Sequence, residues 1–232
     1  MCNFLSAIVL RDGTLICDPE HTDSHEDLLE IHALNDGITA LYQERFARIE
    51  FTPPADSAKI EDLSTWALKI DEEAKPSWFD ETTIRSKCEE RILRIFVRNE
   101  VKILVGGCWI LVGNARAIKV IHSTIKSLHG SSQIGELHGS SQVGELYGSS
   151  QVGELYGSSQ VGELYGSSQV GTLHDSSQVG TLYGSSQVGT LHGSSQVGKL
   201  YASSQVGELY GSSQVGTLCG SSRVGTDKRV KK

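Results

Sequence analysis

The amino-acid sequence predicts a mainly β protein, in which a small α+β N-terminal domain caps a C-terminal β-solenoid of nine-residue repeats. Two observations lead to this fold class. The unit Gly-Ser-Ser-Gln-Val-Gly-Glu-Leu-Tyr recurs, with small changes, eleven times within residues 130–225. The same stretch holds 20 of the 25 glycines in the 232-residue chain. We therefore expect three regions, which are an α+β head at 1–121, a solenoid at 122–226 and a basic tail at 227–232.

The head is expected to begin with a hairpin and a helix. Residues 2–10 and 14–17 are β-prone, and the Asp-Gly pair between them suits a tight turn. Asp23-Ser24 can cap a helix over 26–34, because a polar cap is followed by acidic residues in the first turn.

The rest of the head alternates between strand and helix patterns. Residues 46–51 alternate apolar and polar like a half-buried strand, and 66–70 form a weaker strand candidate. The longest helix is expected over 81–98, where apolar residues recur at helical spacing. Three β-like runs then follow, at 101–105, 108–112 and 117–121. The pattern predicts helices that cover a largely antiparallel sheet.

The repeats can be compared with one another. Both serines and the second glycine recur in all eleven copies, and ten copies have a leucine three residues after the valine. This spacing changes parity, so we expect a strand Ser-Ser-Gln-Val, a bend at the second glycine and a second inward anchor at leucine. Ala202 replaces the first glycine, which suggests that no positive φ is needed there. The second glycine, such as Gly153, is expected to need a positive φ or to lie at a crowded corner.

A unit of nine residues has no core of its own, so it must stack on its neighbours, and two units per 18-residue coil are expected. Residues 122–129 fit the same frame, with Ile125 and Leu128 at the apolar positions, and form a degenerate capping unit. Twelve units then give about six coils at about 4.8 Å each. The charged tail is expected to protect the edge of the last coil.

Positions that vary between repeats should face solvent and form the candidate binding surface. An 18-residue coil stacks them in two columns. The first contains Tyr147, Tyr165, Tyr183 and Tyr201, between His129 and Cys219, and the second contains His138, Tyr156, His174, His192 and Tyr210. The partner expected for this surface is an unknown protein or another copy of the chain.

Several function classes are disfavoured by composition. The net charge is −7 and no basic stripe is present, so no nucleic-acid partner is expected. No apolar run approaches the roughly 20 residues that cross a bilayer, so no membrane partner is expected. The five cysteines lack paired metal spacing, and no cofactor motif, phosphate loop or metal site is expected. Together with the absence of a leader pattern, the cysteines indicate reduced thiols and a cytoplasmic location.

One alternative is an enzyme. Removal of Met1 would expose Cys2, whose own α-amine could act as the base. The start Met-Cys-Asn-Phe-Leu resembles that of class II glutamine amidotransferases, a resemblance of about five residues that would make Cys2 a catalytic nucleophile of an amidohydrolase. Asn3 stands where the family commonly has glycine.

Two further resemblances concern larger parts of the chain. The segment Tyr-Gly-Ser-Ser-Gln resembles Tyr-Gly-Ser-Thr-Gln in the repeats of bacterial ice-nucleation proteins, which implies ice binding, although the period is nine and not sixteen. The start Met-Cys-x-Phe-x-Ser, the Thr-Asp-Ser-His-Glu segment near residue 22 and the repeat tail resemble uncharacterised phage and prophage proteins. That resemblance implies a phage or mobile-element accessory protein and no particular activity.

Overall fold

Two units divide the chain, Met1–Ile95 and Phe96–Lys232. The structure is a computed structural model that describes residues 5–18, 22, 24–34, 45–71 and 74–229. The first unit is small and α+β, and the second is a β-solenoid, so the predicted fold class is confirmed.

A four-stranded antiparallel sheet forms the first unit. Its strands, in the spatial order β2-β1-β3-β4, are β1 (Leu5–Leu10), β2 (Leu15–Ile16), β3 (Phe46–Thr52) and β4 (Ala67–Ile70). The predicted hairpin is present, because Ile8 pairs with Ile16 across the β1–β2 turn. Gly13 has a φ of +78°, and the Asp12 carboxylate accepts a hydrogen bond from the Thr14 N–H at 2.8 Å.

Helices accompany this sheet at the two predicted places. They are α1 (His25–Ile31) and α2 (Glu81–Ile95), with the short 3-10 turns η1 (Ser57–Lys59) and η2 (Leu63–Thr65). The Ser24 hydroxyl caps α1 by accepting from the Asp27 N–H. Leu28 and Leu29 of α1 pack with Ile8 of β1 in a buried cluster. The apolar face of α1 therefore covers the sheet, as its sequence pattern predicted.

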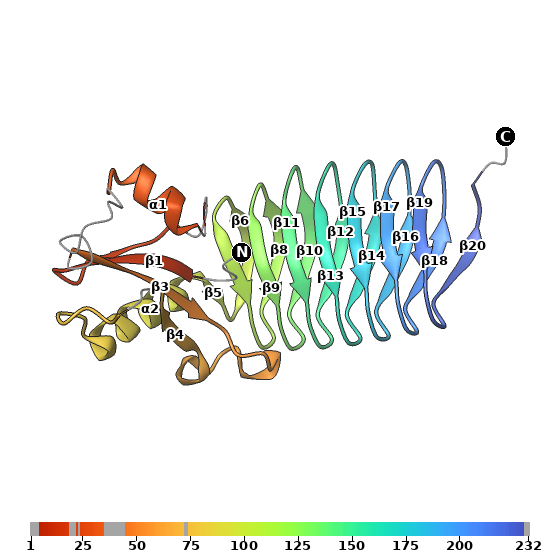
Figure 1. The fold of residues 1–232 in the computed structure, drawn as a ribbon. Coiled ribbons are helices and arrows are strands. Elements are labelled where there is room, and N and C mark those ends of the chain that lie inside the picture. Colours follow the sequence, from red (N-terminus) through yellow and green to blue (C-terminus); the bar gives the residue numbers. More distant parts are fainter. Residues whose placement is uncertain (1–4, 19–21, 23, 35–44, 72–73, 230–232) are drawn as a thin grey trace. The chain divides into compact units, whose positions relative to one another are not determined.

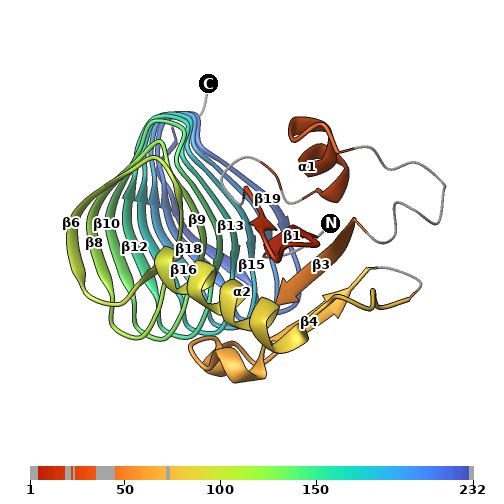
Figure 2. The same ribbon diagram turned by 90° about the vertical axis from the view of Figure 1, so that its left-hand side faces the viewer.

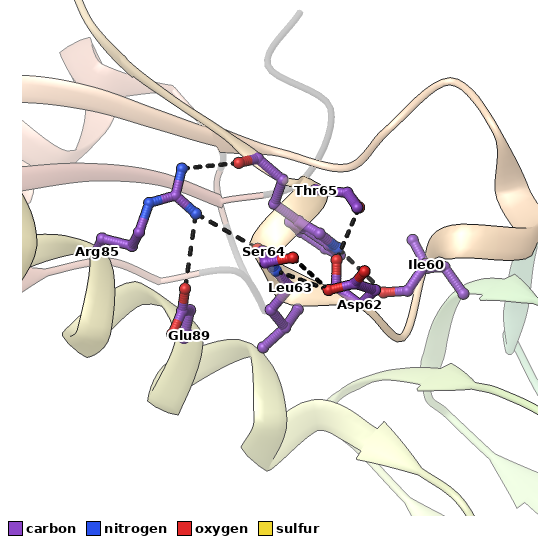
Figure 3. A network of polar contacts seen from close by, with 8 residues as sticks. Ile60, Asp62, Leu63, Ser64, Thr65, Arg85 and Glu89 are labelled. Carbon is purple, nitrogen blue, oxygen red and sulfur yellow. Dashed lines mark hydrogen bonds and ion pairs between the residues drawn. The ribbon is translucent and has the colours of Figure 1, made fainter.

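A polar network joins α2 to the loop before β4 (Figure 3). The Arg85 guanidinium donates to the Trp66 carbonyl at 2.8 Å and to the Leu63 carbonyl at 3.4 Å, and it lies 3.6 Å from the Glu89 carboxylate. The indole N–H of Trp66 donates to the Ile60 carbonyl at 3.0 Å. These bonds tie α2 and the Trp66 side chain to backbone carbonyls of the loop, so the network has a structural role.

The second unit consists of two eight-stranded parallel sheets, and successive strands alternate between them (Figure 1). Its strands are β5 (Phe96–Val97), β6 (Glu100–Val105), β7 (Cys108–Leu111), β8 (Arg116–Ile121), β9 (Thr124–Leu128), β10 (Gln133–His138), β11 (Gln142–Leu146), β12 (Gln151–Leu155), β13 (Gln160–Leu164), β14 (Gln169–Leu173), β15 (Gln178–Leu182), β16 (Gln187–Leu191), β17 (Gln196–Leu200), β18 (Gln205–Leu209), β19 (Gln214–Leu218) and β20 (Arg223–Asp227). We call the sheet of odd-numbered strands the odd sheet and that of even-numbered strands the even sheet.

The repeats stack with an 18-residue period, as predicted. Val143 of β11 lies beside Val161 of β13, and every neighbouring pair of repeat strands has the same register. Ile125 and Leu128 occupy the valine and leucine positions of β9. Residues 124–128 therefore belong to the stack, but they do not cap it, because further strands precede them in both sheets.

The boundary expected at residue 121 needs correction. Strands β6 to β8, which we assigned to an antiparallel sheet of the head, pair in parallel within the solenoid sheets. So does β5, which lies at the end of the helix that we expected over 81–98. Val101 and Leu104 of β6 lie beside Ala117 and Val120 of β8, so the inward pair three residues apart is already present. The solenoid therefore begins earlier and has more coils than expected. Its first coils have the three-residue spacing of the inward side chains but not the Ser-Ser-Gln signature of the repeats.

The strand within each repeat also differs from the expected one. It runs over Gln-Val-Gly-Glu-Leu, whereas the two serines form the turn before it. In β12, for example, the ladder pairs Gln151, Val152, Glu154 and Leu155 with their neighbours and passes over Gly153. The predicted irregularity at this glycine is therefore present, and it allows Val152 and Leu155 both to point into the core.

Candidate interaction surface

Within a repeat, some side chains point into the core and others lie on the surface. In the nine repeats from 130 to 210, the second serine, the apolar residue after glutamine and the leucine are buried, as shown by Ser150, Val152 and Leu155 with at most 1% exposure. At the end of the solenoid, Leu218 is 44% exposed. The buried Ser150 hydroxyl donates to the Tyr147 carbonyl at 2.8 Å and closes the turn. The first serine and the glutamine are exposed, and the Glu and Tyr positions are partly exposed. Only the second of the two serines therefore serves the core.

The two glycines of a repeat are required for different reasons. The first has a positive φ, and so do its replacements Asp175 at +56° and Ala202 at +57°. Our inference that Ala202 marks a position without positive φ is wrong. Asp175 adds a bond of its own, because its carboxylate accepts from the Gly157 N–H at 3.0 Å, one coil earlier. The turn therefore imposes this conformation on alanine and aspartate.

Crowding, and not positive φ, explains the second glycine. A Cβ atom on Gly153 would lie 2.5 Å from the carbonyl oxygen of Gly135 in the preceding strand of the same sheet. The corresponding glycines of the other repeats have the same contact at 2.4–2.6 Å. The crowded-corner alternative is therefore correct, and the absence of side chains at this position leaves the sheet surface bare.

Two columns of stacked rings run along the solenoid, as the 18-residue period predicted. In the first, the Tyr147 and Tyr165 ring centroids are 5.1 Å apart and the planes are 7° from parallel; the same stacking continues through Tyr183 to Tyr201. The second column contains the rings of His138, Tyr156, His174, His192 and Tyr210, with centroids 4.7–5.6 Å apart. Stacked faces cover one another, so the column presents ring edges to solvent.

Carboxylates two residues upstream hold many of these rings. The Tyr147 hydroxyl donates to Glu145 at 2.6 Å and the Tyr210 hydroxyl to Glu208 at 2.7 Å, and Tyr156 and Tyr165 make the equivalent bonds. Lys228 adds a cation to this edge, because its ammonium lies 2.9 Å from Glu208. The candidate surface thus includes four phenol–carboxylate pairs, at Tyr147 and Tyr165 in the first column and at Tyr156 and Tyr210 in the second.

These pairs shift the ionisation of both partners. The hydrogen bond to Glu154, followed by burial, raises the pKa of Tyr156 to about 12. Burial first, and then the bond to Glu145, raises the pKa of Tyr147 further above its ordinary value. The hydrogen bond from His138 lowers the pKa of Glu136. At neutral pH the tyrosines are therefore neutral donors, and Glu136 is a charged acceptor.

A groove of about 230 Å³ lies on the outer face of the even sheet. Its walls are glutamine side chains and its floor is the bare backbone of the second glycines. The lining residues are Arg116, Gln133, Ile134, Gly135, Gln151, Val152, Gly153, Gln169 and Gly171. They come from β8, β10, β12 and β14, so the groove crosses the strands and follows the solenoid axis.

The structure does not test the candidate catalytic residue. Cys2 lies outside the described residues, so its role as a nucleophile stays a prediction. Of the histidines near the predicted cap, His25 is buried, and its Nε2 lies 2.9 Å from the Ile49 carbonyl oxygen while its Nδ1 lies 3.6 Å from the Asp71 carboxylate. Within the described ranges, no group of three His, Cys, Asp or Glu side chains could hold a metal ion.

Comparison with known proteins adds no relative. No protein-family model, curated protein or solved structure matches the chain. The resemblances to glutamine amidotransferases, ice-nucleation repeats and phage proteins therefore rest on short sequence patterns. Among the helices that the structure describes, none is long and apolar enough to cross a membrane.

Sequence reasoning missed two parts of this surface. The carboxylate partners could have been found, because Glu145 precedes Tyr147 by two residues and such residues share one side of an extended strand. The sequence also contained a signal for the groove. Glutamine is exposed and yet recurs in ten of the eleven repeats, whereas the Glu and Tyr positions vary freely.

Proposed function

We propose that this chain is a non-enzymatic binding or assembly protein, whose solenoid presents regular rows of side chains to a protein partner or to another copy of itself. One observation carries the proposal. The outward positions stack in an 18-residue register, so the glutamines, and the tyrosines from Tyr147 to Tyr201, recur along the axis at the spacing of neighbouring strands, about 4.8 Å. A row of this kind can contact a regular partner at many points at once.

The chemistry of the columns is consistent with protein recognition. Stacked tyrosines such as Tyr165 are held at fixed positions, so little side-chain entropy is lost when a partner contacts them. The hydroxyls of Tyr147, Tyr156, Tyr165 and Tyr210 already donate to carboxylates. The remaining carboxylate oxygens can accept bonds from a partner. The sequence resemblance to phage and prophage proteins favours an accessory role in a phage or another mobile element.

Site-specific photo-cross-linking tests the proposal in the full chain. A photo-reactive phenylalanine analogue replaces Tyr165 in the first column or Tyr156 in the second, and the control carries it at Leu93, which is 45% exposed on α2. In extract of the source cells, we expect defined protein adducts from Tyr165 or Tyr156 and none from Leu93. Adducts from Leu93 alone would place recognition in the first unit and contradict the proposal.

The two alternatives from the sequence have direct tests. If the intact mass includes Met1, Cys2 cannot be an N-terminal nucleophile. If Met1 is absent, labelling of Cys2 with an electrophile at the rate of an ordinary thiol would also argue against an amidohydrolase. Ice binding predicts thermal hysteresis and shaped crystals, and unshaped crystal growth at high protein concentration would remove it.

A further inference from the structure

We propose that the second ring column is a pH switch, in which protonation of the stacked His174 and His192 opens the stack and turns an acidic edge into a basic one. The first column keeps its charge over the same pH range. The consequence for partner binding rests on the proposed function, whereas the switch itself belongs to the solenoid and can be tested without a partner. The coils seen end-on in Figure 2 nearly superimpose, so each ring faces the next along the column.

The two columns differ in their imidazoles. In the part of the chain that the structure describes, the partly exposed histidines of the columns all lie in the second one, as His138, His174 and His192. The first column begins at His129, which is 5% exposed, and burial disfavours a charged ring there. Imidazole is the side chain that ordinarily changes charge between pH 5 and 8, whereas phenols stay neutral. A fall in pH over this range therefore adds charge to the second column.

His174 and His192 stack directly on each other. Their ring centroids are 5.6 Å apart and the planes are 8° from parallel, whereas His138 stacks on a tyrosine. Two unit charges at 5.6 Å repel, which disfavours the doubly charged pair by about 3-fold at the dielectric constant of water and by about 150-fold at an effective value of about 20. Protonation of both rings therefore destabilises a stack that neutral rings tolerate.

One carboxylate faces His174. The Glu154 carboxylate, one coil earlier on β12, lies 3.3 Å from its Nε2 atom. Asp175 follows His174 in the chain, but its carboxylate accepts from the Gly157 N–H at 3.0 Å. Protonation of His174 therefore forms an ion pair with Glu154, which competes with the bond that the Tyr156 hydroxyl donates to the same carboxylate.

His192 has no ion-pair partner among the described residues. Thr190 stands two residues before it, at the position where the neighbouring β18 has Glu208. The Glu208 carboxylate already accepts from the Tyr210 hydroxyl at 2.7 Å and from the Lys228 ammonium at 2.9 Å. The second proton of the pair therefore enters beside a charged ring without a carboxylate of its own.

His138 provides a comparison within the same column. Its Nε2 atom lies 2.7 Å from the Glu136 carboxylate, and its ring stacks on the neutral Tyr156. Lys119 lies 3.4 Å from the same carboxylate. Protonated His138 has a carboxylate two residues away and no second imidazole beside it, so we expect its stack to persist in acid.

Protonation also reverses the sign of the column's edge. At neutral pH, four carboxylates outnumber two ammonium groups there, namely Glu136, Glu154, Asp175 and Glu208 against Lys119 and Lys228. Three protonated histidines more than offset this difference. In the first column, Glu145 and Glu163 bond to phenols, which keep their protons over this range. A basic partner held by the second column is therefore released on acidification, and one held by the first column is not.

Hydrogen exchange of the full-length chain at pH 7.5 and pH 5.0 tests the switch, with rates corrected for the intrinsic effect of pH. His192→Tyr replaces one imidazole of the pair by a phenol. Tyr183, which follows Thr181 on the odd sheet, shows that the solenoid already accepts a stacked tyrosine after threonine. The matched control, His138→Tyr, makes the same change in the same column and leaves the pair intact. Circular dichroism at pH 7.5 checks that all three proteins are folded.

We expect acidification to accelerate exchange in β14 and β16 by about tenfold in the unmodified chain and in His138→Tyr, and to leave it nearly unchanged in His192→Tyr. Unchanged exchange in the unmodified chain, or equal acceleration in His192→Tyr, would overturn the switch. The photo-cross-linking at Tyr156 and Tyr165, repeated at both pH values, tests the link to binding, and adducts from Tyr156 alone should decline in acid. Failure to form adducts at either pH would remove the proposed function and leave the switch standing.

Discussion

Replacing Gly162 by alanine should destabilise the solenoid far more than the same change at Gly166, four residues away. At Gly162 the new Cβ atom would lie 2.5 Å from the Gly144 carbonyl oxygen, whereas side-chain carbons keep at least about 3.0 Å from such atoms. The opposing atom belongs to the backbone of a paired strand, so it cannot rotate away. Relief requires about 0.5 Å of movement in a close-packed stack, and we expect a cost of about 3 kcal/mol.

The matched change at Gly166 meets a different obstacle. This glycine has a φ of +68°, and a Cβ atom there would lie 3.1 Å from the Gly148 carbonyl oxygen. The left-handed conformation costs alanine about 1–2 kcal/mol, and the lower entropy of the unfolded chain offsets about 0.4–1 kcal/mol. Ala202 already occupies the equivalent position at +57°. The expected net cost is about 1 kcal/mol.

Urea unfolding followed by circular dichroism gives the overall difference between the two variants. Hydrogen exchange adds the local one, because a solenoid can open near a damaged coil without unfolding entirely. Gly162→Ala should accelerate exchange in β11, β13 and β15, and Gly166→Ala should leave it nearly unchanged. Equal stability of the two variants, within about 0.5 kcal/mol, would refute the crowding argument.

Three other predictions concern ionisation, repeat number and thiols. Because the folded state raises the pKa of Tyr156 to about 12, its contribution to stability is complete below pH 10 and is lost between pH 10 and 12; phenolate absorbance at 295 nm should show this late titration. Deletion of residues 148–165 removes a whole coil and should leave both ring columns in register, as judged by near-ultraviolet circular dichroism. Deletion of 157–165 should instead stack a histidine on Tyr147, and identical spectra for the two deletions would contradict the column assignment. Burial raises the pKa of the Cys88 thiol to about 12, so iodoacetamide at pH 8 should label it far more slowly than an unfolded peptide thiol, which mass spectrometry can measure.

The solenoid could be predicted well from the sequence because the eleven repeats can be aligned with one another. The leucine three residues after the valine required an irregularity, and the 18-residue period followed from the shortness of a nine-residue unit. Both features depend on spacing along the chain, which can be read directly from the sequence. The head elements were also predicted, since Ser24 and the Asp12-Gly13 turn act through neighbouring backbone groups.

The errors arose where contacts between distant coils decide the structure. The crowding at Gly153 depends on a carbonyl oxygen 18 residues earlier, which no local pattern reveals. The first coils were assigned to the head because they lie before the glycine-rich repeats, which begin at Gly130. The three-residue spacing of Val101 and Leu104 indicated a solenoid strand. It was overlooked because the Ser-Ser-Gln signature of the repeats does not accompany it. The groove was missed because glycine and glutamine were considered separately.

One repeat is half a coil, and this has a consequence for how the gene can change. Replication slippage by two units adds or removes a full coil and keeps every later residue on its original sheet. Slippage by one unit moves all later repeats to the opposite sheet and mixes the two columns. From Tyr147 to Tyr201 the first column contains tyrosine alone, whereas the second mixes tyrosine and histidine. This segregation is the pattern that copying in whole coils preserves, so a family of such genes should differ in length by even numbers of units.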